Sequence, residues 1–143
     1  QAPYRRLPRA DEADRLALAR ARPGWEGRAA TLRPNQAVVD FFASPHTALS
    51  LARIEAHYFA HDTFLKADQL LQDAKRLHEI PGVIVHGRYD IVCPFANAWD
   101  LHRAWPAAAL EVVPDAGHSA AEPGIAAALI RATDAMRDRI AGR

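Results

Sequence analysis

The sequence predicts the α/β fold class, because two short apolar strands alternate with two helices after residue 80. The runs "GVIVHG" at 82–87 and "ALEVVP" at 109–114 are short and rich in valine, and the first is typical of a strand buried on both faces of a sheet. We expect helices over 94–105, which starts at a proline, and over 124–140. Strand, helix and strand in this order favour a right-handed βαβ unit and a parallel sheet.

Two strands alone would leave both sheet edges unpaired and apolar faces uncovered, so we expect this half to be the end of a larger sheet. Residues 1–79 carry no convincing strand, and their patterns predict helices over 11–22, 36–42, 47–59 and 63–78. In 47–59, Leu51, Ile54 and Tyr58 fall on one stripe at spacings of three and four. The chain is therefore expected to divide into a helical part over 1–79 and a part of an α/β core over 80–143.

Length, charge and cysteine content narrow the classes of protein to consider. The 143 residues suffice for one domain with a sizeable core, and 18 basic against 17 acidic residues leave a formal charge of +1. This balance gives no reason to expect nucleic acid or an anionic membrane as a partner. No apolar run approaches the roughly 18 residues of a membrane helix. A single cysteine forms no internal disulfide, so we expect a reducing compartment, the cytoplasm.

Asp90 and His118 each follow one of the expected strands, in "GRYDIVCP" and "DAGHSAAEP". The carboxyl ends of neighbouring parallel strands lie at one edge of a sheet, so we expect the two loops to meet. A carboxylate that accepts the Nδ1–H of an imidazole fixes its tautomer and stabilises its protonated form. A loop-capping aspartate and a surface histidine are the alternative. The order of acid and base nevertheless matches the α/β-hydrolase triad, which runs Ser, Asp/Glu, His, and favours a catalytic pair.

The nucleophile of such a triad is missing from the chain. It requires Gly-x-Ser-x-Gly between a strand and a helix, whereas Ser44, Ser50 and Ser119 lack glycines two residues to each side. Ser119 directly follows the histidine and is better explained as a local hydrogen-bonding residue. Cys93 lies in the loop of the acid, where we expect it to line the site rather than to attack. We therefore expect the nucleophile and the oxyanion hole on polypeptide that precedes the first residue.

Three stretches resemble the proline iminopeptidase (prolyl aminopeptidase) family: "IPGVIVHGRYDIVCPFANAWDLHRAWP", "DAGHSAAEP" and the helical "ARIEAHYF". These are serine peptidases of the α/β-hydrolase fold that release an N-terminal residue, preferably proline, without metal or cofactor. The resemblance implies the C-terminal half of such an enzyme: part of a helical cap over 1–79, then the last two core strands and helices over 80–143. Asp90 and His118 would be its acid and base. Its partners would be a peptide with a free N-terminal proline and the missing N-terminal half, without which the chain alone would be inactive.

The resemblance also implies substrate-binding residues. Glu26 in "WEG" and Glu55 in "ARIEAHYF" would bind the free amine, Phe59 would form a wall of the proline pocket, and Cys93 would lie close to the triad and confer sensitivity to thiol reagents. Carboxylates in a partly desolvated pocket distinguish a cationic chain end from an internal amide, which would leave them unpaired. Glu55 lies among apolar residues rather than in a charged run. For Glu26, the sequence alone leaves a structural role open.

Other functions stay open at this point. His57 and His61 have a spacing that can hold a metal, but no third ligand stands at a suggestive distance, so we expect no metal site. Another capped α/β-hydrolase, such as an esterase or epoxide hydrolase, would share the acid and base but would not need carboxylates for an amine. A non-catalytic helical module for binding or assembly would need neither.

Overall fold

The computed structural model describes residues 25–142, which form two compact units. One holds 25–29 and Arg33–Ala67, and the other holds Ala30–Leu32 and residues 68–142. The second unit includes the helical turns between 69 and 77, which pack against the helix that follows the first strand. The helix predicted over 11–22 lies outside the described residues.

The first unit is helical. Residues 25–29 are helical, followed by α3, Gln36–Ala43, and α4, Pro45–Ala60. The side chain of Asn35 accepts the N–H of Val38 at 3.3 Å, which satisfies one of the amides that a helix start leaves unpaired. Ser44 is extended between the two helices, and Pro45 occupies the first turn of α4, where the missing N–H costs nothing. The second helix therefore begins two residues before the predicted start.

The predicted apolar stripe of α4 is not the face that packs. Ile54 is 58% exposed and Tyr58 is 48% exposed, whereas Ala48 and Ala52 are buried. Alanine side chains allow close approach between helices, and α4 packs against α3. The spacing of the large residues places them on one stripe of the helix, but periodicity does not say which face of a helix has a neighbour.

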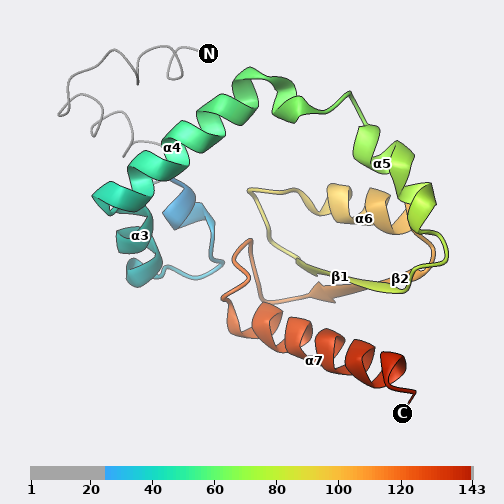
Figure 1. Cartoon of the computed structure of the whole chain (residues 1–143). Coiled ribbons are helices and arrows are strands. Elements are labelled where there is room, and N and C mark those ends of the chain that lie inside the picture. Colours follow the sequence, from blue (N-terminus) through green and yellow to red (C-terminus); the bar gives the residue numbers. More distant parts are fainter. Residues whose placement is uncertain (1–24, 143) are drawn as a thin grey trace. The chain divides into compact units, whose positions relative to one another are not determined.

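The single helix predicted over 63–78 is also wrong. The chain instead forms three short pieces: η1, Asp62–Phe64, α5, Gln69–Asp73, and η2, Ala74–Leu77 (Figure 1). Thr63, Phe64 and Asp68 have positive φ angles between 54° and 60°. A right-handed helix cannot pass through residues in the left-handed region. The leucines therefore have the spacing of a helix, although the backbone does not form one continuous helix.

The second unit contains a parallel two-stranded sheet between two helices, which fits the α/β class. Strand β1, Gly82–Gly87, pairs with β2, Ala108–Val113. Helix α6, Phe95–Ala104, connects them, and α7, Pro123–Ile140, closes the chain. The two helices cover opposite faces of the sheet (Figure 1).

The sheet is less buried than its apolar sequence suggested. In β1 only Gly87 is buried, and Val83 is exposed, so the expectation of a strand buried on both faces is wrong for the described residues. The compact core lies instead at the ends of the strands. Val113 and Ala116 form it together with Ile125 and Ala128 of α7, and Val85 packs against this cluster. In β2 the buried residues are those at its two ends, Ala108 and Val113, and the residues between them are half-buried or exposed.

Glycine at the end of β1 lets the two loops approach closely. A Cβ atom on Gly87 would lie 1.9 Å from the carbonyl oxygen of Gly117 and 2.7 Å from that of Ala116. Arg88 N–H donates to the carbonyl of Val113 at 2.9 Å, and Tyr89 N–H donates to that of Ala116 at 3.0 Å. The chain segments after the two strands are thus joined directly, backbone to backbone.

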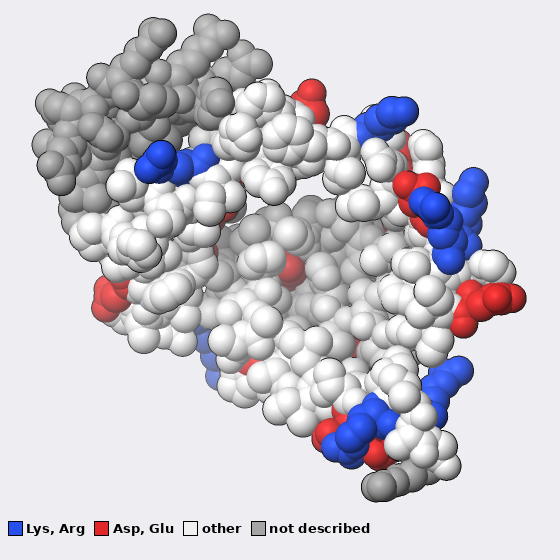
Figure 2. Space-filling model, viewed as in Figure 1, with Lys and Arg blue, Asp and Glu red and all other residues white. Residues whose placement is uncertain are grey.

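Charges are mixed on the surface. Arg131 pairs with Glu111 at 2.6 Å, and Arg137 pairs with Asp134 and Asp138 at 2.9 Å; basic and acidic side chains also lie next to one another on the face shown in Figure 2. No helix among residues 25–142 has both the length and the apolar character needed to span a membrane.

Candidate active site

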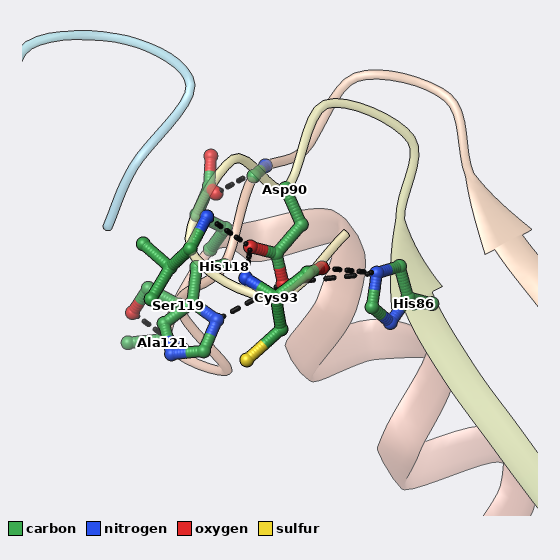
Figure 3. A network of polar contacts seen from close by, with 9 residues as sticks. His86, Asp90, Cys93, His118, Ser119 and Ala121 are labelled. Atoms are coloured by element: carbon green, nitrogen blue, oxygen red, sulfur yellow. Dashed lines mark hydrogen bonds and ion pairs between the residues drawn. The ribbon is translucent and has the colours of Figure 1, made fainter. Parts of the chain in front are cut away.

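Asp90 is held in the loop after β1 by the backbone of that loop. Its Oδ1 accepts the N–H of Val92 at 2.9 Å and of Cys93 at 2.7 Å. The side chain is 5% exposed. A carboxylate with two amide donors on one oxygen has a fixed orientation, and here that orientation leaves Oδ2 facing the loop after β2 (Figure 3).

His118 contacts this second oxygen. Its Nδ1 lies 2.9 Å from Asp90 Oδ2, and the two residues come from the loops that follow adjacent parallel strands. Because an ionised carboxylate only accepts, Nδ1 carries the proton, and Nε2 of the neutral ring is left with a lone pair. The side chain of His118 is 40% exposed. The structure therefore brings the two residues into hydrogen-bond contact, with the carboxylate of Asp90 buried and the imidazole of His118 accessible.

The backbone at His118 is fixed by a segment far away in the sequence. The carbonyl oxygen of Ala30 accepts the N–H of His118 at 3.0 Å and that of Ser119 at 2.7 Å. The hydroxyl of Ser119 accepts the N–H of Ala121 at 3.2 Å, which is the local role that the sequence suggested for it. The imidazole is thus anchored from both sides, by its ring and by its own amide.

Glu122 is a further anchor of this loop, and sequence reasoning missed it. Its Oε1 accepts the N–H of Gly117 at 2.6 Å, and its Oε2 accepts that of Leu32 at 3.2 Å. An acid directly before Pro123 at a helix start suggests a cap for the helix, yet the side chain makes no bond to the first turn of α7. The sequence signal, an acid at the start of a helix, therefore suggested the first turn of α7 as the partner of Glu122, which is wrong.

His86 was missed as well. It lies in β1 with its side chain 13% exposed, and its Nε2 is 3.7 Å from Asp90 Oδ2. The strand pattern marked it only as a polar residue in an apolar run. Its position one residue before the glycine that ends the strand could have indicated that it reaches the loop of the acid.

Cys93 is exposed and lies in the same loop as Asp90, beside the pair in Figure 3. Partial burial, and then the charge of Asp90, raise the pKa of the Cys93 thiol above its ordinary value. The neutral thiol is a poor nucleophile. This agrees with a residue that lines the site and does not attack.

The residues expected to bind substrate lie in the first unit. Glu26, in the helical stretch 25–29, is buried with 8% of its surface exposed. Glu55 and Phe59 lie one turn apart on α4, the first half-buried and the second exposed. Their roles, like those of Asp90 and His118, stay predictions. Burial of a carboxylate costs free energy unless the carboxylate has partners. The sequence alone did not indicate that Glu26 is buried.

His57 and His61 lie in an aromatic cluster with Phe64. Their ring centroids are 4.6 Å apart, the ring of His61 stacks on Phe64, and His61 Nδ1 contacts the carbonyl oxygen of His57 at 2.7 Å. Within residues 25–142, no group of three or more His, Cys, Asp or Glu residues has the arrangement of a metal site.

Comparison with known proteins finds relatives of one kind. The chain is 55% identical over 134 residues to a proline iminopeptidase of Xylella fastidiosa, covering 93% of the chain and 43% of the relative. Over nearly its whole length, this chain is similar to proline iminopeptidases. Identity is 54% over 132 residues to the proline iminopeptidase of Xanthomonas citri and 45% over 135 residues to that of Arabidopsis thaliana. These matches cover 92% and 94% of the chain, and 42% and 36% of the relatives.

The chain thus spans less than half the length of these relatives. No family model matches it. The similarity to proline iminopeptidases expected from the three sequence stretches is confirmed.

Proposed function

We propose that this chain is the C-terminal part of a serine aminopeptidase of the proline iminopeptidase type, which has an α/β-hydrolase core and releases proline from the N-terminus of peptides. The observation that carries the proposal is the 2.9 Å contact between Asp90 Oδ2 and His118 Nδ1 at the ends of adjacent parallel strands. The serine and the oxyanion hole would come from polypeptide outside these 143 residues. By themselves the 143 residues are expected to be inactive, and the whole enzyme is expected in the cytoplasm.

In the whole enzyme, His118 would act through Nε2. A serine hydroxyl would attack the carbonyl carbon of the first residue while Nε2 takes its proton, and the same proton would pass to the leaving peptide amine. Asp90 would hold Nδ1–H throughout and stabilise the imidazolium formed between the two steps. Two backbone donors on Oδ1 keep the carboxylate from turning away as this charge appears.

Glu26 and Glu55 would bind the free amine of the substrate. A carboxylate such as that of Glu26, which is buried, would attract the cationic amine of a chain end more strongly than the neutral amide of an internal peptide bond. Phe59, exposed one turn after Glu55, would supply apolar contact to the proline ring. That these residues face the acid–base pair in the whole enzyme is part of the proposal.

A chimera tests the proposal. The chain would be joined to the portion of the Xylella fastidiosa relative that it does not cover, and hydrolysis of proline p-nitroanilide would be followed by absorbance. We expect activity in the chimera and none in the chain alone. His118→Ala and Asp90→Asn should each lower kcat by about a thousandfold or more, because they remove the base or its correct tautomer. A folded chimera without activity would overturn the proposal.

Substrate choice distinguishes the alternatives. Glu26→Gln and Glu55→Gln should raise KM or lower kcat/KM for proline p-nitroanilide by about tenfold to a hundredfold, while hydrolysis of the neutral ester p-nitrophenyl acetate is unchanged. Arg28→Gln, an exposed neighbour in the same helical stretch, is the matched control. Equal loss on both substrates would favour a structural role for the two acids, and full activity on the proline substrate would favour another capped hydrolase.

A further inference from the structure

His86 contacts the loop of the catalytic acid at two points. Its Nε2 lies 3.1 Å from the carbonyl oxygen of Cys93 and 3.7 Å from Asp90 Oδ2, as Figure 3 shows. A carbonyl oxygen only accepts hydrogen bonds, so Nε2 carries a proton. The N–H therefore points to the carbonyl of Cys93 and lies close to the same carboxylate oxygen that faces His118.

The peptide of Cys93 is consequently held at both ends. Its N–H donates to Asp90 Oδ1 at 2.7 Å, and its carbonyl accepts from His86 at 3.1 Å. On the other side, the ring of Phe95 packs against His86 at 5.8 Å between centroids, which limits rotation of the imidazole. The turn from residue 90 to 93 is thus closed between the carboxylate and a ring that is itself fixed.

We propose that His86 is a positioning residue, which holds the turn of residues 90–93 so that Oδ2 of Asp90 stays directed at Nδ1 of His118. It acts through the carbonyl of Cys93 and does not touch substrate. Without its N–H, the carbonyl of Cys93 loses its partner and the turn is free to rotate, which lengthens the 2.9 Å contact of the pair. The effect of His86 on catalysis rests on the proposed function. Its effect on the contact between Asp90 and His118 does not depend on that function.

A second histidine offers a matched control. His102 in α6 also places a ring nitrogen near a backbone carbonyl, with Nδ1 2.9 Å from the oxygen of Ala108. It is half-buried in the same unit, and its partner lies at the other end of β2 from the acid–base pair. Removal of either ring N–H should cost similar stability, but only removal at His86 should affect the pair.

The test uses the 143-residue chain with 15N-labelled histidine. An imidazole N–H bonded to a carboxylate gives a far-downfield proton resonance, and His118→Ala, which must abolish it, assigns the resonance to His118. We expect His86→Phe to speed exchange of this proton with water by about tenfold or more. His86→Gln, whose amide N–H can donate to the same carbonyl, should restore slow exchange, and His102→Phe should leave it unchanged.

Two results would overturn the inference: slow exchange in His86→Phe, or equally fast exchange in His102→Phe. Absence of the resonance from the unmodified chain would remove the pair itself and the inference with it. In the active chimera, His86→Phe should lower kcat by about tenfold to a hundredfold with little change in KM. A chimera that is inactive while the exchange results hold would refute the proposed function and leave the positioning role in place.

Discussion

Replacement of Gly87 with Ala would test whether the two loops approach as closely as the structure shows. The added Cβ would lie 1.9 Å from the carbonyl oxygen of Gly117. This is a backbone atom, so no side chain can turn aside, and the loop that carries His118 must move by about 1 Å or more. A contact of 2.9 Å between Asp90 and His118 that lengthens by this amount is no longer a hydrogen bond.

Such overpacking costs about 1–3 kcal/mol, and we expect Gly87→Ala to reach the upper end because the bond from Tyr89 N–H to Ala116 is lost too. Urea unfolding of the chain by circular dichroism gives the free energy, and the downfield resonance of His118 reports the pair. Gly117→Ala is the graded control. Its Cβ would meet its nearest neighbours at 3.1–3.4 Å, so we expect a loss below about 1 kcal/mol. Equal stability of the two variants, with the resonance intact in both, would refute the close approach.

Three further predictions concern single residues. Alkylation of Cys93 by iodoacetamide should be slow at neutral pH and speed up only above the ordinary thiol pKa. At neutral pH, Asp90→Asn should speed it, because the smaller of the two causes that raise the pKa of the thiol is removed and more thiolate is present; an unchanged rate would contradict this. Glu122→Ala should lower the free energy of unfolding by about 2 kcal/mol and Glu122→Gln by about half as much, in urea titrations, since two backbone amides lose a charged acceptor. Trp105→Phe should cost about 1 kcal/mol by the same measurement, because the indole N–H donates to the carbonyl of Ile80 at 2.8 Å; no loss would show that water replaces this bond freely.

The helices and strands that the sequence predicted well are those with clear local signals at both ends. The two strands and α7 begin and end within two residues of the predicted positions, because apolar runs bounded by glycine or proline leave few alternatives. The stretch 63–78 failed because its helical leucine spacing contains Thr63, Phe64 and Asp68 in the left-handed region. Threonine and phenylalanine rarely adopt the left-handed conformation, so their presence gives no reason to predict it.

The candidate site shows the same division. Asp90 and His118 could be found because side chain meets side chain at strand ends, and both residue types indicate acid–base chemistry. His86 and Glu122 contact backbone atoms: the carbonyl of Cys93 in one case, and amides of distant segments in the other. Every residue except proline carries the same backbone donor and acceptor. A contact of this kind therefore leaves at most an indirect signal in the sequence, such as the position of His86 beside the glycine that ends β1, and its partner becomes visible only in the folded chain.

The residues that orient the pair of Asp90 and His118 all lie within one compact unit of the chain. Asp90 is oriented by the loop that it begins, and His118 by Ala30 and by the carboxylate itself. All of these donors and acceptors belong to the same compact unit. The contacts that orient the pair therefore all come from residues of this chain. If the proposed function holds, orientation of the base would be a property of this unit, and activation of a nucleophile would depend on the polypeptide that supplies the serine.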